Sequence, residues 1–246
     1  MSRAASTAGQ TANGASGVDG EAHENGNQAS DGDEPRAADG RVPGRRGRAT
    51  RQKLLDCTTE MLRTTSYRDL KVVDIAREAG TSPATFYQYF AEVESAVLVL
   101  ADEMVTTGVE QFGDLVTGGN WKGKAGYETA LSLVDAMLDF WAQHQPVVRV
   151  VDLATDEGDG RFANVRTRLL NDLNNALAGA ARDQQKSGKG QTDLDPNAIA
   201  GVLVAMLAHV SAHRLGFEFW GVKTDDLRSA MARIVFWSIT GQKPPA

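Results

Sequence analysis

The stretch that decides the fold runs from residue 70 to residue 90 and reads LKVVDIAREAGTSPATFYQYF. It predicts one short helix over residues 72–79 and a second over residues 83–89. Gly80 stands where a helix end favours a residue with positive φ. Ser82 and Pro83 supply an N-cap and a first-turn proline. Two short helices joined by a glycine-containing turn form a helix-turn-helix.

The two predicted helices have distinct inner and outer faces. Phe86 and Phe90, four residues apart, fall on the side of Ile75 and are expected in the core. Ala76 and Ala79 are small enough to let the helices cross closely. The outer side chains are small or carry hydroxyl and amide groups, which suits the major groove of DNA. They are Thr81, Ser82, Pro83, Ala84, Thr85, Gln88 and Tyr89.

The charge of the chain is unevenly distributed. Residues 45–90 carry nine Lys or Arg and five Asp or Glu, a net charge of +4, whereas the whole chain has a net charge of −6. A short basic module in an acidic protein indicates an anionic partner. Its first part is expected to be a DNA-binding arm, or alternatively a solvated linker. The arginines of this arm are Arg45, Arg46, Arg48 and Arg51.

The flanking segments complete an all-α organisation. Residues 1–44 have few large apolar side chains and are expected to form a disordered acidic tail. Residues 45–92 form the basic arm and the three-helix helix-turn-helix domain. Residues 93–246 form a larger helical domain for ligand binding and dimerisation. Apolar periodicity predicts its helices at about 93–113, 124–143, 146–155, 160–184, 195–217 and 224–240, and an earlier one from about residue 50 to the Thr64–Ser66 stop.

Residues 73–90 resemble the helix-turn-helix signature of TetR-family transcriptional regulators, and the match extends from about Arg48 to Glu94. The resemblance implies a dimer that binds a palindromic operator in double-stranded DNA and responds to a small ligand. By position, Tyr87 matches a tyrosine that contacts phosphate, with a surface or packing aromatic as the alternative for Tyr87 and Tyr89. The family's frequent lysine at the start of the next helix is Val93 here. Phosphate contact is therefore assigned to Lys71 and the arm.

The larger domain contains candidates for a ligand pocket, each with ordinary core packing as its alternative. Residues 141–162 are similar to TetR-type regulators of lipid metabolism, which implies a long apolar ligand such as a fatty acyl-CoA. A pocket between bundle helices is the default location for such a ligand. The candidate pocket residues are Phe112, Met137, Phe140, Trp141, His144, Val148, Arg149, Val151, Met206 and His209.

The last two predicted helices carry apolar stripes expected to pair with a second copy, or alternatively to pack within the chain. In the resembled family these helices form a four-helix bundle between two copies. The candidate interface residues are Leu203, Leu207, Val210, Arg214, Leu227, Met231, Ile234 and Val235.

Several other classes are excluded by what the sequence lacks. The single cysteine, Cys57, cannot form an internal disulfide, and the four histidines show no convincing metal-ligand spacing. No nucleophile elbow or phosphate loop indicates an enzyme, and no cofactor is expected. Without a signal peptide or a membrane-spanning run, the protein is expected to be cytoplasmic. The leading hypothesis is a ligand-released repressor, and the alternative is a protein-interaction module with a vestigial DNA-binding head.

Overall fold

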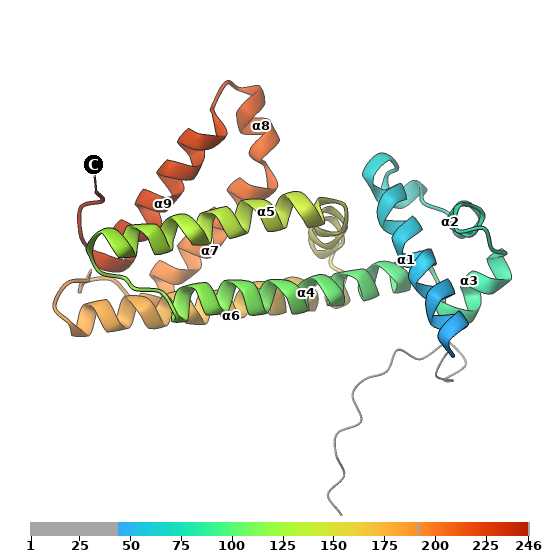
Figure 1. Ribbon diagram of the computed structural model, residues 1–246, viewed down its shortest axis with the longest axis horizontal. Coiled ribbons are helices and arrows are strands. Elements are labelled where there is room, and N and C mark those ends of the chain that lie inside the picture. Colours follow the sequence, from blue (N-terminus) through green and yellow to red (C-terminus); the bar gives the residue numbers. More distant parts are fainter. Residues whose placement is uncertain (1–43, 191, 246) are drawn as a thin grey trace, which may run out of the picture. The chain divides into compact units, whose positions relative to one another are not determined.

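The computed structural model describes residues 44–190 and 192–245, and the regular elements in these ranges are all helical, which confirms the predicted fold class (Figure 1). The predicted acidic tail falls outside these ranges apart from Gly44. No helix in the described ranges is long and apolar enough to cross a membrane. The elements are α1 (Arg45–Thr64), η1 (Tyr67–Asp69), α2 (Val72–Glu78), α3 (Pro83–Tyr89), α4 (Val93–Thr117), α5 (Gly123–Asp156), α6 (Gly160–Lys186), α7 (Pro196–Ala212), α8 (Arg214–Phe219) and α9 (Thr224–Thr240).

The turn between α2 and α3 has the predicted structure. Gly80 adopts a φ of 64°, and the backbone N–H of Thr81 donates to the carbonyl of Ala76 at 2.8 Å, closing the end of α2. Ser82 caps α3, because its Oγ accepts a hydrogen bond from the backbone N–H of Thr85 at 3.2 Å. These local bonds fix the angle at which α3 leaves α2.

A compact apolar core supports this turn. Phe86 is fully buried, and its ring lies 5.4 Å from that of Phe90, centroid to centroid. Ile75 of α2 and Leu54 and Leu55 of α1 are also fully buried. The predicted core positions of Phe86, Phe90 and Ile75 are therefore confirmed. We call α1–α3 the head.

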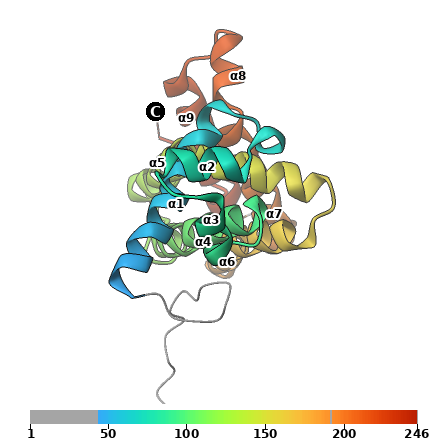
Figure 2. The ribbon, with the colours of Figure 1, turned by 90° about the vertical axis from the view of Figure 1, so that its right-hand side faces the viewer.

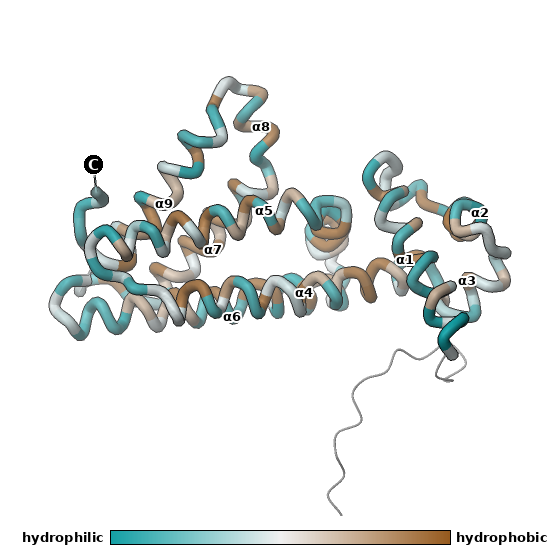
Figure 3. The backbone as a smooth tube through the Cα atoms, in the orientation of Figure 1, coloured by the Kyte–Doolittle hydropathy of each residue, from teal (hydrophilic) through white to brown (hydrophobic). Residues whose placement is uncertain are grey.

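The larger domain is organised around α4, which packs against α5 and α6. Figure 3 shows hydrophobic residues along α4, α5 and α7, the helices that supply much of the core. The approach is closest at Gly108 on α4. A Cβ atom placed there would lie 2.5 Å from Leu169 Cδ1 and 2.9 Å from Phe140 Cζ, distances below van der Waals contact. Glycine at this position therefore lets three helices meet.

Three helix boundaries differ from the predictions. Helix α1 begins at Arg45, so the predicted arm is helical. Helix α5 continues through Pro146 as one helix of 34 residues. This proline forgoes one backbone hydrogen bond, but Val147, Val148, Val150 and Val151 bury an apolar face that favours a continuous helix. The predicted helix 195–217 is divided at His213, whose non-helical backbone separates α7 from the short α8.

The close approach at Gly108 yields a matched stability test within α4. Gly108→Ala should lower the free energy of unfolding by about 1–2 kcal/mol, because overpacking outweighs the higher helix propensity of alanine. Gly113→Ala should raise it by about 0.5–1 kcal/mol, because the added methyl group would meet nothing within 4 Å apart from its chain neighbours and the nearby backbone of its own helix. Urea unfolding followed by circular dichroism measures both changes. If Gly108→Ala were as stabilising as Gly113→Ala, the close approach would be wrong.

Candidate functional site

The outward face of α3 presents small and hydrogen-bonding side chains. Pro83, Ala84 and Gln88 are exposed, and Tyr87 is 53% exposed with its ring against the buried ring of Phe86. Figure 2, which views the molecule from the side of the head, shows α2 and α3 facing the viewer. A short helix with an amide, a phenol and two small residues has the size and chemistry to enter a major groove.

Four predicted outward residues are partly engaged within the head. The hydroxyl groups of Ser82 and Thr85 form a hydrogen bond with each other at 3.0 Å. Thr81 is half-buried, and its Oγ1 donates to the carbonyl of Ala76 at 3.4 Å. Tyr89 is half-buried and packs near Phe90, with 6.4 Å between ring centroids. The prediction that Tyr89 lies on or near the outward surface therefore stays a prediction, with a packing aromatic as its alternative.

The arginines predicted as an extended arm lie on α1. Arg45, Arg46 and Arg48 are exposed in its first turns. Arg51 is half-buried, and its guanidinium carbon lies 5.4 Å from the centroid of the Phe90 ring. A helix is too wide to lie in a minor groove as an extended arm would. The first three arginines therefore form a basic helix end, while Arg51 packs within the head.

Lys53 is a basic residue that the sequence-based set missed. A Cβ atom at Gly80 would lie 3.5 Å from Lys53 Nζ, which places this ammonium beside the turn between α2 and α3. Lys53 follows Arg46 by seven residues and therefore shares its helix face. Had the first helix been predicted to begin at residue 45, its periodicity would have placed Arg46 and Lys53 on one face. Lys71, which was predicted, is exposed at the N-cap of α2.

Ion pairs connect the head to the turn between α5 and α6. Arg161 contacts Glu92, at the start of α4, with 3.3 Å between Nη1 and Oε1. Arg161 also pairs with Asp159, the N-cap of α6, at 2.8 Å, and its hydrogen bonds lower the pKa of that carboxyl. Arg68 of η1 pairs with Glu157. A displacement of the α5–α6 turn would therefore disturb one ion pair with η1 and one with the N-cap residue of α4.

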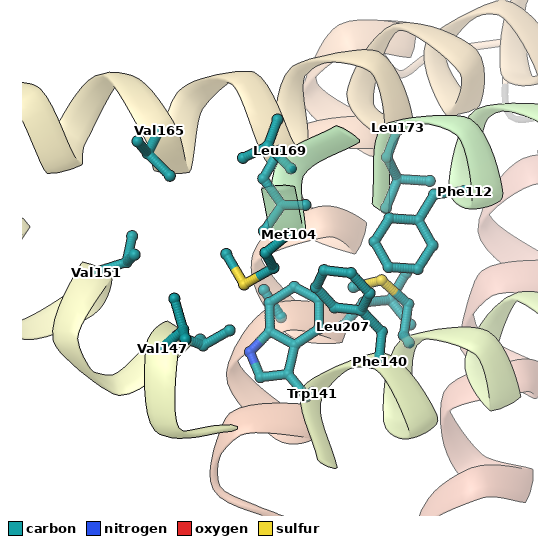
Figure 4. Close-up of a cluster of buried hydrophobic side chains, with 14 of the residues drawn as sticks. Met104, Phe112, Phe140, Trp141, Val147, Val151, Val165, Leu169, Leu173 and Leu207 are labelled. Atoms are coloured by element: carbon teal, nitrogen blue, oxygen red, sulfur yellow. The ribbon is translucent and has the colours of Figure 1, made fainter. Parts of the chain in front are cut away.

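A cavity of about 870 Å³ lies among α5, α6 and α7, with Met104 of α4 in its wall. We call it the ligand cavity. Figure 4 shows Trp141 beside Met104, with Leu169 and Val151 on the two sides of the same interior. Among the predicted pocket residues, five line the cavity. They are Trp141, Val148, Arg149, Val151 and His209.

The other predicted pocket residues do not line this cavity. Phe112, Met137 and Phe140 are buried in the core. The ring of Phe112 packs at 5.0 Å from Phe140 and 6.3 Å from Trp141, centroid to centroid, so it supports the cavity wall from behind. His144 packs on Phe140 at 4.5 Å, and burial lowers its pKa. Met206 is half-buried elsewhere on α7. The hydrophobicity of a residue alone could not show whether its side chain lines the cavity or lies in the core layer behind the cavity wall.

Charged groups of both signs surround the ligand cavity. Arg166 Nε lies 3.2 Å from Asp152 Oδ1. Burial raises the pKa of Asp152, and the charge of Arg166 opposes this shift. The rings of His209 and His213 stack at 4.2 Å. The cavity therefore combines apolar walls with a polar rim. Arg166 and Asp152 belong to this rim and were absent from the predicted set.

The predicted dimer residues divide into buried and accessible groups. Leu203, Leu207, Met231 and Val235 are buried within one chain and are unavailable to a second copy, so their assignment is wrong. The most apolar stripe of each helix faces its own core. Val210 and Leu227 are half-buried, and Arg214 pairs with Glu218 at 3.5 Å. Ile234 is exposed, together with Val202 and Trp237 on the outward faces of α7 and α9.

Comparisons with known proteins match both parts of the chain. Residues 54–92 match the family model of bacterial regulatory proteins of the tetR family, and residues 112–246 match that of the tetracyclin repressor-like C-terminal domain. The HTH-type transcriptional regulator YdgC of Bacillus subtilis strain 168 is 22% identical over 200 residues, which cover 81% of this chain and 95% of YdgC.

Two solved structures share the fold at low sequence identity. FadR from Bacillus subtilis, in complex with stearoyl-CoA, has 17% identity and a TM-score of 0.58, covering 78% of this chain and 98% of FadR. A transcriptional regulator from Saccharomonospora viridis, in complex with choline, has 20% identity and a TM-score of 0.65, covering 79% of this chain and 100% of the other. The C-terminal model alone spans more than half of the chain, so this protein belongs to the TetR family of transcriptional regulators.

Proposed function

We propose that two copies of this chain form a repressor that binds a palindromic operator and releases it when an amphiphilic ligand enters the ligand cavity. The observation that carries the DNA-binding part is the capped helix α3, which follows a turn with the ammonium of Lys53 beside it. Base contacts are assigned to Ala84, Thr85 and Gln88. Phosphate contacts are assigned to Tyr87 and to basic side chains of α1 and α2, because cationic groups near the groove gain from counterion release.

The ligand assignment rests on the two-part chemistry of the ligand cavity. Trp141, Met104 and Leu169 offer apolar walls for an acyl chain. Arg149 and Arg166 lie at the rim, where a carboxylate, thioester or phosphate would meet a guanidinium. A volume of about 870 Å³ lies in the upper part of the usual range of about 300–1,000 Å³ for ligand pockets. The binding of stearoyl-CoA by the structural neighbour FadR is consistent with a fatty acyl-CoA.

A choline-like cation is the second candidate ligand, favoured by a specific pair of residues. Trp141 and Asp152 both line the ligand cavity, and an aromatic face with a carboxylate is the usual recognition site for a quaternary ammonium. The structural neighbour from Saccharomonospora viridis binds choline. A ligand as small as choline would fill only a fraction of this volume, so we favour the acyl compound.

The ion pairs at the α5–α6 turn provide the route from ligand to DNA. Asp152 of α5 and Arg166 of α6 line the ligand cavity, and between them lies the turn that contacts η1 and the start of α4. A ligand that prefers a displaced turn would shift the population of head orientations. Such coupling is typically about 1–3 kcal/mol, or about 5–150-fold in affinity.

Dimerisation is assigned to the outward faces of α7 and α9. Val202, Ile234 and Trp237 are large apolar residues exposed on these two helices. Their burial against the same surface of a second copy would give a closed two-fold interface, which is the symmetry that a palindromic operator requires.

The first test separates phosphate contacts from base contacts. It uses an operator that has been selected from random DNA duplexes. Tyr87→Phe should weaken binding about fivefold for all operator variants, because it removes one hydrogen bond to phosphate. Gln88→Ala should instead change the ranking of operator variants by about 1–3 kcal/mol. Fluorescence anisotropy measures both effects. Tyr89→Phe is the matched control and should bind like the wild type. Unchanged binding by Tyr87→Phe and Gln88→Ala would exclude α3 as the contact surface.

The second test fills the ligand cavity. Palmitoyl-CoA should raise the Kd of the wild-type protein for its operator at least about tenfold, whereas choline should not. Ala212→Trp should abolish this response while leaving DNA affinity intact, because Ala212 lines the cavity far from α3. The control Gln143→Trp adds the same bulk on the exposed surface of α5. Release by choline alone would favour the cation, and an intact response in Ala212→Trp would place the ligand elsewhere.

The third test addresses the dimer. The double variant Ile234→Glu/Trp237→Glu should sediment at half the mass of the wild type, because paired apolar surface would have to bury four carboxylates. Leu153→Glu adds a charge at an exposed apolar residue of α5 and should leave the dimer intact. A double variant that still sediments as a dimer would move the interface away from these faces.

A further inference from the structure

A groove of about 400 Å³ runs between α6 and α7 and continues into the ligand cavity. We call it the side groove. The groove opens to solvent, because Asn171 of α6 and Gly201 of α7 line it and are exposed. A ligand that fills the ligand cavity can therefore extend into the side groove. The lining residues common to both are Arg166, Leu170, Ala205 and Ala208.

Two carboxamide groups line the side groove from α6. Asn171 and Asn174 are three residues apart and therefore lie on one face of this helix, with about 5–6 Å between their Cβ atoms. Neither side chain forms a hydrogen bond within residues 44–190 and 192–245. Each carboxamide has a carbonyl acceptor and an N–H₂ donor. The side groove therefore offers two sets of donor and acceptor groups to a ligand.

A glycine in the opposite wall leaves room beside these carboxamides. Gly201 lies within α7, where glycine is less favourable than alanine. A Cβ atom at this position would lie 3.9 Å from Asn174 Oδ1, its nearest neighbour outside the backbone of α7 and the adjacent residues. This is an ordinary van der Waals distance, so packing does not require glycine here. The same distance shows that the carboxamide oxygen of Asn174 faces Gly201 across the groove. A locally unfavourable residue without a packing reason indicates a functional site.

The pantetheine arm of an acyl-CoA matches this arrangement of groups. In this class of compound, a thioester joins the apolar acyl chain to a narrow pantetheine arm with two amide groups, and a nucleotide follows. Two methylene groups separate the two amides. The amides are therefore about 5 Å apart when extended, one carbon–carbon bond more than the repeat of an extended peptide. This spacing is close to that of Asn171 and Asn174.

We propose that the side groove binds the pantetheine arm of the acyl-CoA, with its two amides hydrogen-bonded to Asn171 and Asn174 and its narrow chain against Gly201. This inference rests on the proposed function, which assigns the acyl chain to the ligand cavity. The thioester then lies near Arg166, which lines both the cavity and the groove. The nucleotide extends past the groove into water. The protein therefore recognises the thioester and discriminates against the free fatty acid, which lacks both amides.

Three palmitoyl thioesters test this assignment in the full-length protein without DNA. S-ethyl thiopalmitate keeps the chain and the thioester but has no amide, palmitoyl-pantetheine adds both amides, and palmitoyl-CoA adds the nucleotide. Isothermal titration calorimetry measures their Kd values. Palmitoyl-pantetheine should bind at least about tenfold more tightly than S-ethyl thiopalmitate, because its amides add two hydrogen bonds. Palmitoyl-CoA should bind at least as tightly as palmitoyl-pantetheine, and markedly weaker binding would overturn the assignment to a coenzyme A thioester.

Substitutions in the side groove decide where the amides bind. The double variant Asn171→Ala/Asn174→Ala should weaken the binding of palmitoyl-pantetheine about tenfold and leave that of S-ethyl thiopalmitate unchanged. Alanine favours a helix more than asparagine does, so this variant should fold. Gly201→Leu should have the same selective effect, because its side chain would fill the groove. The control Asn175→Ala removes a carboxamide of α6 that does not line the groove, and it should change neither affinity.

The outcomes that contradict the inference separate it from the proposed function. Equal affinity for palmitoyl-pantetheine and S-ethyl thiopalmitate would overturn the inference and leave the acyl ligand in place. Unchanged binding of palmitoyl-pantetheine by the double variant would do the same. If none of the three thioesters binds, the proposed acyl ligand fails, and the inference fails with it.

Discussion

The contact at Gly108 is the constraint on which the rest of the structure depends. A side chain at this point of α4 would overlap Leu169 and Phe140, so glycine alone lets α4 lie directly against α5 and α6. With its middle held in this way, α4 cannot shift independently of the layer that forms the ligand cavity. Helix α4 begins directly after the head. Glu92, the residue before its first turn, is paired with Arg161 of α6. The close packing at Gly108 and the pair between Glu92 and Arg161 therefore join α4 to the helices that line the cavity.

The ligand cavity lies next to the contacts between α4, α5 and α6. Its wall includes Met104, one turn before Gly108 on α4, and residues of α5 and α6 that flank the turn contacting the head. Close-packed interiors respond to an inserted group by discrete shifts rather than by continuous deformation. A ligand that separates α5 from α6 would therefore act on the ion pairs of Arg161 and Arg68. TetR-family membership establishes a transcriptional regulator, and these contacts provide its proposed mechanism of release.

Local signals in the sequence predicted the head accurately, whereas the larger domain depended on packing that sequence patterns do not encode. Gly80, Ser82 and Pro83 have specific conformational roles, so α2, the turn and α3 were placed within one residue. The first turns of α1 were missed because their residues are polar and lack an apolar stripe. Periodicity placed Leu203 and Phe112 on apolar stripes, but it cannot distinguish a core, a cavity wall and an interface between copies, so Leu203 was assigned to the interface and Phe112 to the pocket although both are buried in the core.

Sequence-specific binding to DNA is the claim on which the account rests. The most direct measurement is fluorescence anisotropy of the purified protein, near physiological salt, with the DNA upstream of its own coding region and with a scrambled duplex of equal length. The account predicts a preference of about 10³-fold or more for the upstream DNA, the lower end of the usual range for specific binding. The account would be contradicted if both duplexes bound with equal and strongly salt-dependent affinity, and if duplexes recovered by genomic selection bound no better. Only electrostatic attraction to the DNA backbone would then operate.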